Sequence, residues 1–309
     1  MVKMIYKIFI GLPRKIFFYS LKLYRKILIS KFPNTLRLPS YPYITGDSFR
    51  KFSDHVLDEG KKINVKKVKK NDIVFVQSNF IDEYFAKYNS KISEKHILIS
   101  QNDLHPITGK YQNQVGDNII CWFAQNLDIE SETKKLKALP LGIENIRTYS
   151  NGVTSHFESK IVKANINLKT NLVLSSFAPH TNYEKRGELA EIVRNLKYVD
   201  IFVYPNHKEY INNLSSYKFN ICPSGAGIDT HRFWESLLVK SVPIVLRNNL
   251  INHFLNHEIP MLVINDWNEL HNFDSEKLNK LYRDLLPQLS SDNYLWFDYW
   301  KELIKAEKK

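Results

Sequence analysis

Residues 218–247 read KFNICPSGAGIDTHRFWESLLVKSVPIVLR, and the fold can be worked out from this stretch. The apolar run at 219–222 predicts a buried strand. Residues 223–227, PSGAG, are too flexible and too turn-prone to continue a strand or to begin a helix. The stretch therefore opens with a strand that leads into a glycine-containing loop.

A helix and a second strand follow this loop. Asp229 or Thr230 offers an N-cap, and apolar side chains recur at helical spacing between residues 233 and 238. The next apolar run, at 242–246, predicts the second strand. The order strand, loop, helix, strand is typical of an α/β protein with a parallel sheet.

The loop and the first helical turn have the chemistry of an anion site. Gly225 and Gly227 let a ligand approach the backbone, and the start of a helix favours negative charge. Arg232 and Glu235 are three positions apart and share one face of the helix. Arginine can take phosphate oxygens in a fork, and a carboxylate can accept sugar hydroxyls, so the pair suits a nucleotide diphosphate-sugar. The alternative is an ordinary packing unit in which the two side chains form a surface ion pair.

The same stretch resembles a known signature. The run Pro223-x-Gly225-x-Gly227-x-Asp229-Thr230-His231-Arg232-x-Trp234-Glu235, followed by Val242-Pro243-Ile244-Val245, is similar to the donor site of exostosin-like glycosyltransferases. It also resembles related bacterial enzymes that build surface polysaccharides. The resemblance implies two Rossmann-like domains that face a cleft, the GT-B architecture, with the nucleotide sugar held by the C-terminal domain.

The resemblance also implies roles for individual residues. Arg232 would contact phosphate and Glu235 the ribose. The rest of the donor site would comprise Gly225, Gly227, Asp229, Thr230 and His231. Related transferases carry an arginine after the first strand of the C-terminal domain, which corresponds to Arg186. Residues 239–241, VKS, depart from the family, whose members more often have a glycine there. Family members mostly invert the anomeric configuration, and we expect inversion here.

Length and composition bound the organisation of the chain. A chain of 309 residues with 43% hydrophobic residues is long enough and apolar enough for two domains with cores of their own. Cys121 and Cys222 each lie in an apolar run, which favours reduced core residues in a cytosolic protein, and no Cys/His cluster suggests zinc. We expect a Rossmann-like acceptor domain at 33–160 and a Rossmann-like donor domain at 161–309.

The net charge of +12 is unevenly distributed. Residues 1–32 contain eight Lys or Arg, no acidic residue, and apolar side chains at helical spacing. No uncharged stretch within this segment is long enough to span a bilayer. We therefore expect a basic amphipathic segment that lies on an anionic membrane, peripherally and on the cytoplasmic face. The alternative is an ordinary N-terminal helix packed on the domain.

The first half of the chain contains strands separated by segments of helix length. Apolar runs at 72–76, 96–100 and 118–123 predict parallel strands, beyond whose carboxyl ends ligands collect. Asp103 follows one of these ends and is our first candidate for the general base, and Glu144 is the second. The alternative is that Asp103 forms an Asx turn and Glu144 a cap or ion pair. Upstream, we expect residues 44–50 to form a turn that leads into a helix reaching about residue 60, with Asp47 as its cap rather than as an acceptor contact.

The second half begins with a strand at 171–175, followed by a loop and a helix that carries Arg186. His180 and Asn182 in this loop are further donor-site candidates. Strands are expected at 200–204 and 261–264, with a short helix at 206–216. The aromatic tail at 294–300 is compatible with a helix that returns to the first domain.

These observations lead to a glycosyltransferase that moves a sugar from a nucleotide-sugar donor to a glycan or a glycolipid in surface polysaccharide synthesis. No Asp-x-Asp motif is present, so we expect metal-independent transfer and no cofactor. One alternative is a transferase of a nucleotide-activated polyol phosphate on the same fold. Another is a nucleic-acid-binding protein that uses the lysine-rich residues 61–70, but this segment lacks interleaved aromatics, and nucleic acid is not an expected partner.

Overall fold

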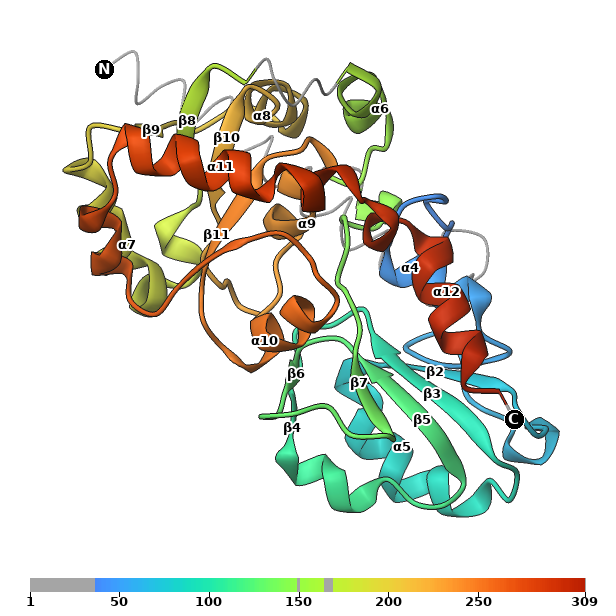
Figure 1. The fold of residues 1–309 in the computed structure, drawn as a ribbon. Coiled ribbons are helices and arrows are strands. Elements are labelled where there is room, and N and C mark those ends of the chain that lie inside the picture. The colour runs from blue at the N-terminus through green and yellow to red at the C-terminus, as the bar shows by residue number, and fades with distance from the viewer. Residues whose placement is uncertain (1–36, 149–150, 164–168, 309) are drawn as a thin grey trace, which may run out of the picture.

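The chain folds as an α/β protein built around two five-stranded parallel sheets (Figure 1). The computed structural model describes residues 37–148, 151–163 and 169–308. A short two-stranded parallel pair, β4 (Ile107–Thr108) and β6 (Leu127–Asp128), accompanies the two large sheets. The predicted α/β class with parallel strands is confirmed.

The first sheet, which we call the N-terminal sheet, has the strand order β1-β2-β3-β5-β7. Its strands are β1 (His55–Leu57), β2 (Ile73–Gln77), β3 (His96–Gln101), β5 (Ile119–Ala124) and β7 (Leu136–Ala138). Every residue of β2 and β3 is buried, as is usual for parallel strands covered on both faces. The three strands predicted in this half are confirmed to within one residue at each end.

The second sheet, the C-terminal sheet, has the order β12-β11-β10-β8-β9. Its strands are β8 (Asn171–Ser175), β9 (Val199–Ile201), β10 (Tyr217–Ile221), β11 (Val242–Leu246) and β12 (Leu262–Ile264). The chain adds β9 on one side of β8 and then crosses to β10 on the other side. The strand order therefore reverses between β8 and β10, and such a point is where open α/β sheets bind ligands.

Helices connect the strands and cover the sheets. In the first half they are α4 (Gly46–Phe52), α5 (Ile81–Lys87) and α6 (Ser155–Lys163). In the second half they are α7 (Tyr183–Arg194), α8 (His207–Leu214), α9 (His231–Leu238), α10 (Asn249–Asn256), α11 (Ser275–Ser290) and α12 (Phe297–Ala306). Short 3-10 helices are η2 (Val65–Lys67), η3 (Ser78–Phe80), η4 (Asn89–Lys91), η5 (Gly109–Gln114), η6 (Ile146–Thr148), η8 (Pro179–Thr181), η9 (Trp267–Asn272) and η10 (Asn293–Leu295).

Two predictions near the start of the described chain are wrong. The helix expected to reach residue 60 ends at Phe52, and residues 55–57 form the edge strand β1 instead. Thr45, not Asp47, caps this helix, because the Thr45 side chain accepts the amide hydrogen of Ser48 at 3.1 Å. Further along, the strand expected at 200–204 is shorter and spans Val199–Ile201. The expected domain boundary after residue 160 lies within α6 and stays a prediction.

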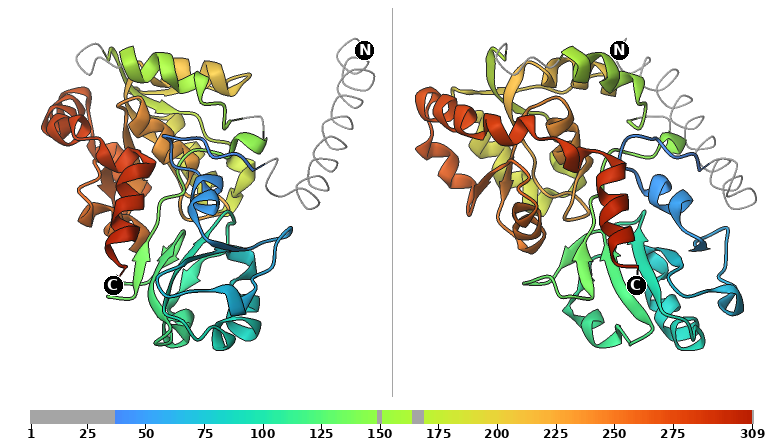
Figure 2. Two further views of the ribbon diagram at one scale, coloured as in Figure 1. Left: turned by 90° about the vertical axis from the view of Figure 1, so that its right-hand side faces the viewer. Right: turned by 45° about the vertical axis from the view of Figure 1, so that its right-hand side comes forward.

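The C-terminal helix α12 lies beside α4, far from it in sequence (Figures 1 and 2). The rings of Phe49 and Phe297 are 5.1 Å apart between centroids, and the Tyr41 hydroxyl donates to Asp298 at 2.7 Å. The predicted return of the aromatic tail to the first half of the chain is confirmed.

The basic segment expected at residues 1–32 lies outside the described residues. Across the ranges that the structure does describe, no helix combines the length and the apolar character needed to cross a bilayer. Peripheral membrane contact stays a prediction.

Candidate functional site

A pocket of about 730 Å³ opens at the carboxyl ends of β8, β9 and β10. It is lined by the loop after β8 at 176–180, by residues 203–207 after β9, and by residues 230–232 at the start of α9. The side chains of Asn151, Arg186, Tyr210 and Glu235 complete the lining. Because the strand order reverses between β8 and β10, the pocket occupies the position that the topology favours for a ligand.

Arg232 brings a positive charge to this pocket. Its guanidinium carbon is 5.3 Å from the centre of the Tyr210 ring, in cation–π geometry. Burial lowers the pKa of Arg232, but Tyr210, Cys222 and Glu235 more than offset this, so the pKa is raised above its ordinary value. The side chain is therefore a permanent cation in the pocket wall.

Arg186 is a second cation of the pocket, and this buried side chain joins two loops. Its Nε donates to the Ser224 carbonyl at 2.9 Å, and Nη2 donates to the Pro223 carbonyl at 3.0 Å. Nη1 donates to the Ala178 carbonyl at 3.2 Å and to the Thr181 hydroxyl. Burial, together with the charge of Arg232, lowers the pKa of Arg186 to about 10. The charge of Arg232 therefore disfavours the charge of Arg186, and an anion in the pocket would relieve this.

Glu235 is the carboxylate of the pocket, and its partner is a histidine. Glu235 is only 5% exposed, and its Oε1 lies 2.9 Å from Nε2 of His207. Among the ion pairs of the described residues, Glu235 pairs with His207 and not with Arg232. The alternative drawn from the sequence was a surface ion pair between Arg232 and Glu235, and the described part of the structure does not contain this pair.

The two glycines of the loop are positioned by close packing. A Cβ on Gly225 would lie 3.0 Å from Nη2 of Arg186, and one on Gly227 would lie 3.1 Å from Nδ2 of Asn126. The amide of Gly225 donates to the Gly227 carbonyl at 3.0 Å, and Asn182 donates to the Gly225 carbonyl at 2.7 Å. Gly225, Gly227 and Asn182 are not among the residues that line the pocket, and their contacts shape the loop behind it.

Asp229 and His231 tie the start of α9 to the N-terminal sheet. The Asp229 carboxylate accepts the Leu141 amide at 2.8 Å and the Trp234 indole N–H at 3.0 Å. The His231 ring contacts the Gly142 carbonyl through Nδ1 at 2.8 Å. Burial raises the pKa of Asp229 to about 6, although these hydrogen bonds oppose the rise. Asp229 does not line the pocket.

Thr230, His231 and His180 do line the pocket. The sequence predicted either Asp229 or Thr230 as the N-cap of α9. Thr230 occupies this position, but its side chain makes no capping hydrogen bond. Of the ten residues expected at the donor site, the structure places these three in the pocket together with Arg186, Arg232 and Glu235.

The two candidates for the general base lie outside the pocket lining. The Asp103 carboxylate accepts the amide of Leu104 at 2.8 Å and that of His105 at 3.3 Å, which is the geometry of an Asx turn. Glu144 accepts the amide of Asn151 at 3.1 Å, and Asn151 lines the pocket. Glu144 is therefore one residue removed from the pocket on the side of the N-terminal sheet.

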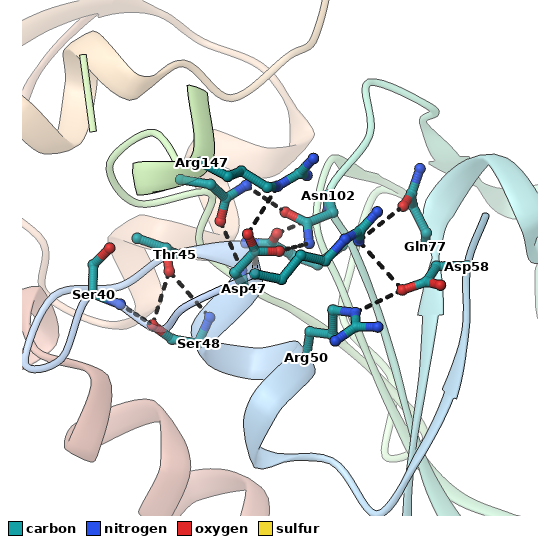
Figure 3. Close-up of polar contacts among 12 residues, drawn as sticks. Ser40, Thr45, Asp47, Ser48, Arg50, Asp58, Gln77, Asn102 and Arg147 are labelled. Carbon is teal, nitrogen blue, oxygen red and sulfur yellow. Dashed lines mark hydrogen bonds and ion pairs between the residues drawn. The ribbon is translucent and has the colours of Figure 1, made fainter. Parts of the chain in front are cut away.

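A buried polar network lies at the carboxyl ends of β2 and β3 (Figure 3). Asp47, fully buried, lies 2.8 Å from Nε of Arg147 and accepts a hydrogen bond from Asn102 at 3.0 Å. Burial raises the pKa of Asp47, and the charges of Arg147 and Arg37 act against this rise. The network holds the segment that contains Glu144 against the N-terminal sheet.

The sequence did not single out His207 and Tyr210, which line the pocket, or His156, which lies outside the lining. His207 and Tyr210 lie on α8, which was predicted only as a short helix, and His156, on α6, contacts His207. The position of His207 shortly after β9 was the available signal, since side chains beyond the carboxyl ends of parallel strands converge.

In residues 37–148, 151–163 and 169–308, no group of three or more His, Cys, Asp or Glu side chains has the arrangement of a metal site. Sugar transfer without a metal ion stays a prediction. No family model matches the sequence, and no curated protein is significantly similar to it.

Proposed function

We propose that the protein is a glycosyltransferase that transfers a sugar from a nucleotide-sugar donor to a glycan or glycolipid acceptor. In this proposal the pocket beside β8 and β10 holds the donor. Its volume of about 730 Å³ is within the range of small-molecule sites. The two lobes of a GT-B enzyme would correspond to the two parallel sheets, with the acceptor bound on the side of the N-terminal sheet.

One observation carries the proposal. Arg186 and Arg232 reach the pocket from α7 and α9, on either side of the point where the strand order reverses. Two guanidiniums, Arg186 buried and Arg232 partly buried, leave a net positive charge beside the single carboxylate of the wall, which suits a diphosphate. The start of α9, at Thr230 and His231, adds the positive end of a helix.

The contacts suggest a division of labour between the two arginines. Arg186 already donates to three carbonyls and a hydroxyl, so its main task is to hold the two loops in place and to add charge. The Arg232 guanidinium contacts the Tyr210 side chain rather than backbone carbonyls, so its N–H groups are the ones we assign to phosphate oxygens. Without a metal, these two side chains would neutralise the donor and the leaving diphosphate.

A thermal-shift screen with UDP-, GDP- and CMP-linked sugars tests this function. A donor at a hundredfold excess over its Kd should raise Tm by roughly 5 °C. The shift should disappear in Arg232→Ala and persist in Arg194→Ala, which removes an exposed arginine paired with Glu191. A donor that stabilises Arg232→Ala as well as it stabilises the wild type would contradict the proposed site. CDP-glycerol in the same screen tests the alternative of polyol phosphate transfer.

A further inference from the structure

Within the described part of the chain, two opposite charges in the pocket wall form no ion pair with each other, although their spacing on the helix favours one. Arg232 and Glu235 lie at positions i and i+3 of α9, where side chains of opposite charge ordinarily meet. In the described residues the ion pair of Glu235 is with His207 instead. An Arg232 guanidinium paired with Glu235 would have little charge left for a phosphate.

His207 is well placed to hold Glu235. Its Nε2 lies 2.9 Å from Oε1 of Glu235, and both side chains are nearly buried, at 5% and 6% exposure. The ring packs against Phe157, with centroids 5.4 Å apart, and against Tyr210, with centroids 5.9 Å apart. These contacts fix the plane of the imidazole and therefore the direction of its N–H.

A second histidine supports the first. Nδ1 of His156, on α6, lies 3.0 Å from Nδ1 of His207. Two facing nitrogens at this distance share one hydrogen, so a neutral His207 that donates through Nε2 accepts through Nδ1. His156 then donates, and the pair defines which nitrogen of His207 faces Glu235.

We infer that His207 is a positioning residue that holds Glu235 away from Arg232 and thereby leaves the Arg232 guanidinium to a diphosphate. The inference rests on the proposed function, because it assumes that the pocket binds a diphosphate. It assigns to His156 the supporting task of orienting the His207 ring. Loss of His207 frees Glu235 to turn toward Arg232 and to compete with the ligand.

Calorimetric titration of the full chain with inorganic pyrophosphate tests this inference without knowledge of the base or the sugar. His207→Ala should weaken pyrophosphate binding roughly tenfold, since an ionic hydrogen bond to Arg232 must then be broken. His207→Gln, which keeps an N–H near the position of Nε2, should stay within about threefold of the wild type. His55→Gln is the matched control, because His55 pairs with Asp72 at 2.8 Å outside the pocket.

The double variant His207→Ala/Glu235→Gln separates positioning from a general structural role. Removing the charge of Glu235 should restore binding to within about twofold of Glu235→Gln alone, since no competing carboxylate remains. If the double variant binds as weakly as His207→Ala, the inference is overturned while the proposed function stands. If the wild type does not bind pyrophosphate, or if Arg232→Ala binds it equally well, both are overturned.

Discussion

Oδ2 of Asp229 accepts the amide hydrogen of Leu141 at 2.8 Å, which joins the N-terminal end of α9 to the segment that follows β7. The Asp229 carboxylate is itself held in place within α9, because Nε1 of the Trp234 indole lies 3.0 Å from both of its oxygens. The helix that carries Arg232 and Glu235 is therefore positioned by a contact with the other sheet. The first prediction concerns the stability that this buried carboxylate contributes.

Asp229→Asn should destabilise the protein by an amount that depends on pH. Burial raises the pKa of Asp229 to about 6 in the folded protein, above its ordinary value of 3.8. The folded state thus binds this proton more readily than the unfolded state, so the contribution of the group to the free energy of unfolding falls as pH rises from about 4 to about 6. Asp229→Asn should have a lower free energy of unfolding than the wild type, and this difference should shrink by about 2–3 kcal/mol over this interval. Urea unfolding at pH 4 and pH 7 measures it, and an equal deficit at both pH values would contradict the prediction.

Arg186 and Arg232 should differ in their effects on stability. Arg186→Ala leaves the carbonyls of Pro223, Ser224 and Ala178 without their donor and should lower the free energy of unfolding by about 3 kcal/mol. Arg186→Lys should lose most of the same amount, because one ammonium does not reproduce the fork that joins the two loops.

The comparison for this prediction is Arg232→Ala, which should lower the free energy of unfolding by less than about 1 kcal/mol. This variant loses a contact with the Tyr210 ring rather than a set of buried hydrogen bonds. Arg194→Ala, at an exposed position, should have no measurable effect. Equal losses for Arg186→Ala and Arg232→Ala would show that the loops do not depend on Arg186.

Lys240 lies in the turn between α9 and β11 and has an unusual backbone conformation. Its φ is +60°, in the region that favours glycine, and its ammonium donates to the Leu289 carbonyl at 2.9 Å and to Asp292 at 2.8 Å. Lys240→Ala loses these contacts and keeps the unfavourable backbone, so it should destabilise by about 2–3 kcal/mol. Lys240→Gly should be more stable than Lys240→Ala by about 1 kcal/mol, because glycine adopts a positive φ without steric strain. Thermal unfolding in which glycine is worse than alanine would refute this account.

The general base can be assigned with two variants. Removing a general base typically lowers kcat by a factor of about 10²–10⁴. Asp103→Asn and Glu144→Gln should leave nucleotide affinity intact, and the variant that lacks the base should lose turnover by this factor. The other variant should stay near the wild-type rate. Near-normal kcat in both would remove Asp103 and Glu144 from the role.

Transfer should not need a divalent metal. In the proposed function, Arg186 and Arg232 would supply the positive charge that a metal would otherwise bring to the diphosphate. Turnover in excess EDTA should therefore match turnover in untreated buffer. A loss of activity in EDTA that manganese restores would show that the two arginines are insufficient.

Much of the C-terminal sheet could be predicted from local patterns. The strands β8 and β11 coincide with the predicted ranges, because each is a short apolar run bounded by turn residues. The edge strand β1 could not be recognised in the same way. It has three residues, begins with His55, and continues a segment whose start has helical character, so its pairing with β2 decides its conformation.

The pocket was predictable only in part, for a similar reason. Arg232 and Glu235 belong to one continuous motif, so their proximity follows from helical spacing. His156 and His207 are separated by 51 positions and meet only because α6 packs on α8. The Asp47, Asn102 and Arg147 network is equally non-local, and its members look like ordinary turn and cap residues in the sequence.

The path of the chain through α12 has a practical consequence for dissecting this protein. A single cut between the sheets would leave α12 on the C-terminal fragment, where Phe297 would lose Phe49, its partner across the contact with α4. Two fragments expressed separately should therefore aggregate or recombine rather than behave as independent units. A workable split needs a second cut before Phe297, with the last helix supplied to the N-terminal piece by permuting the order of the segments.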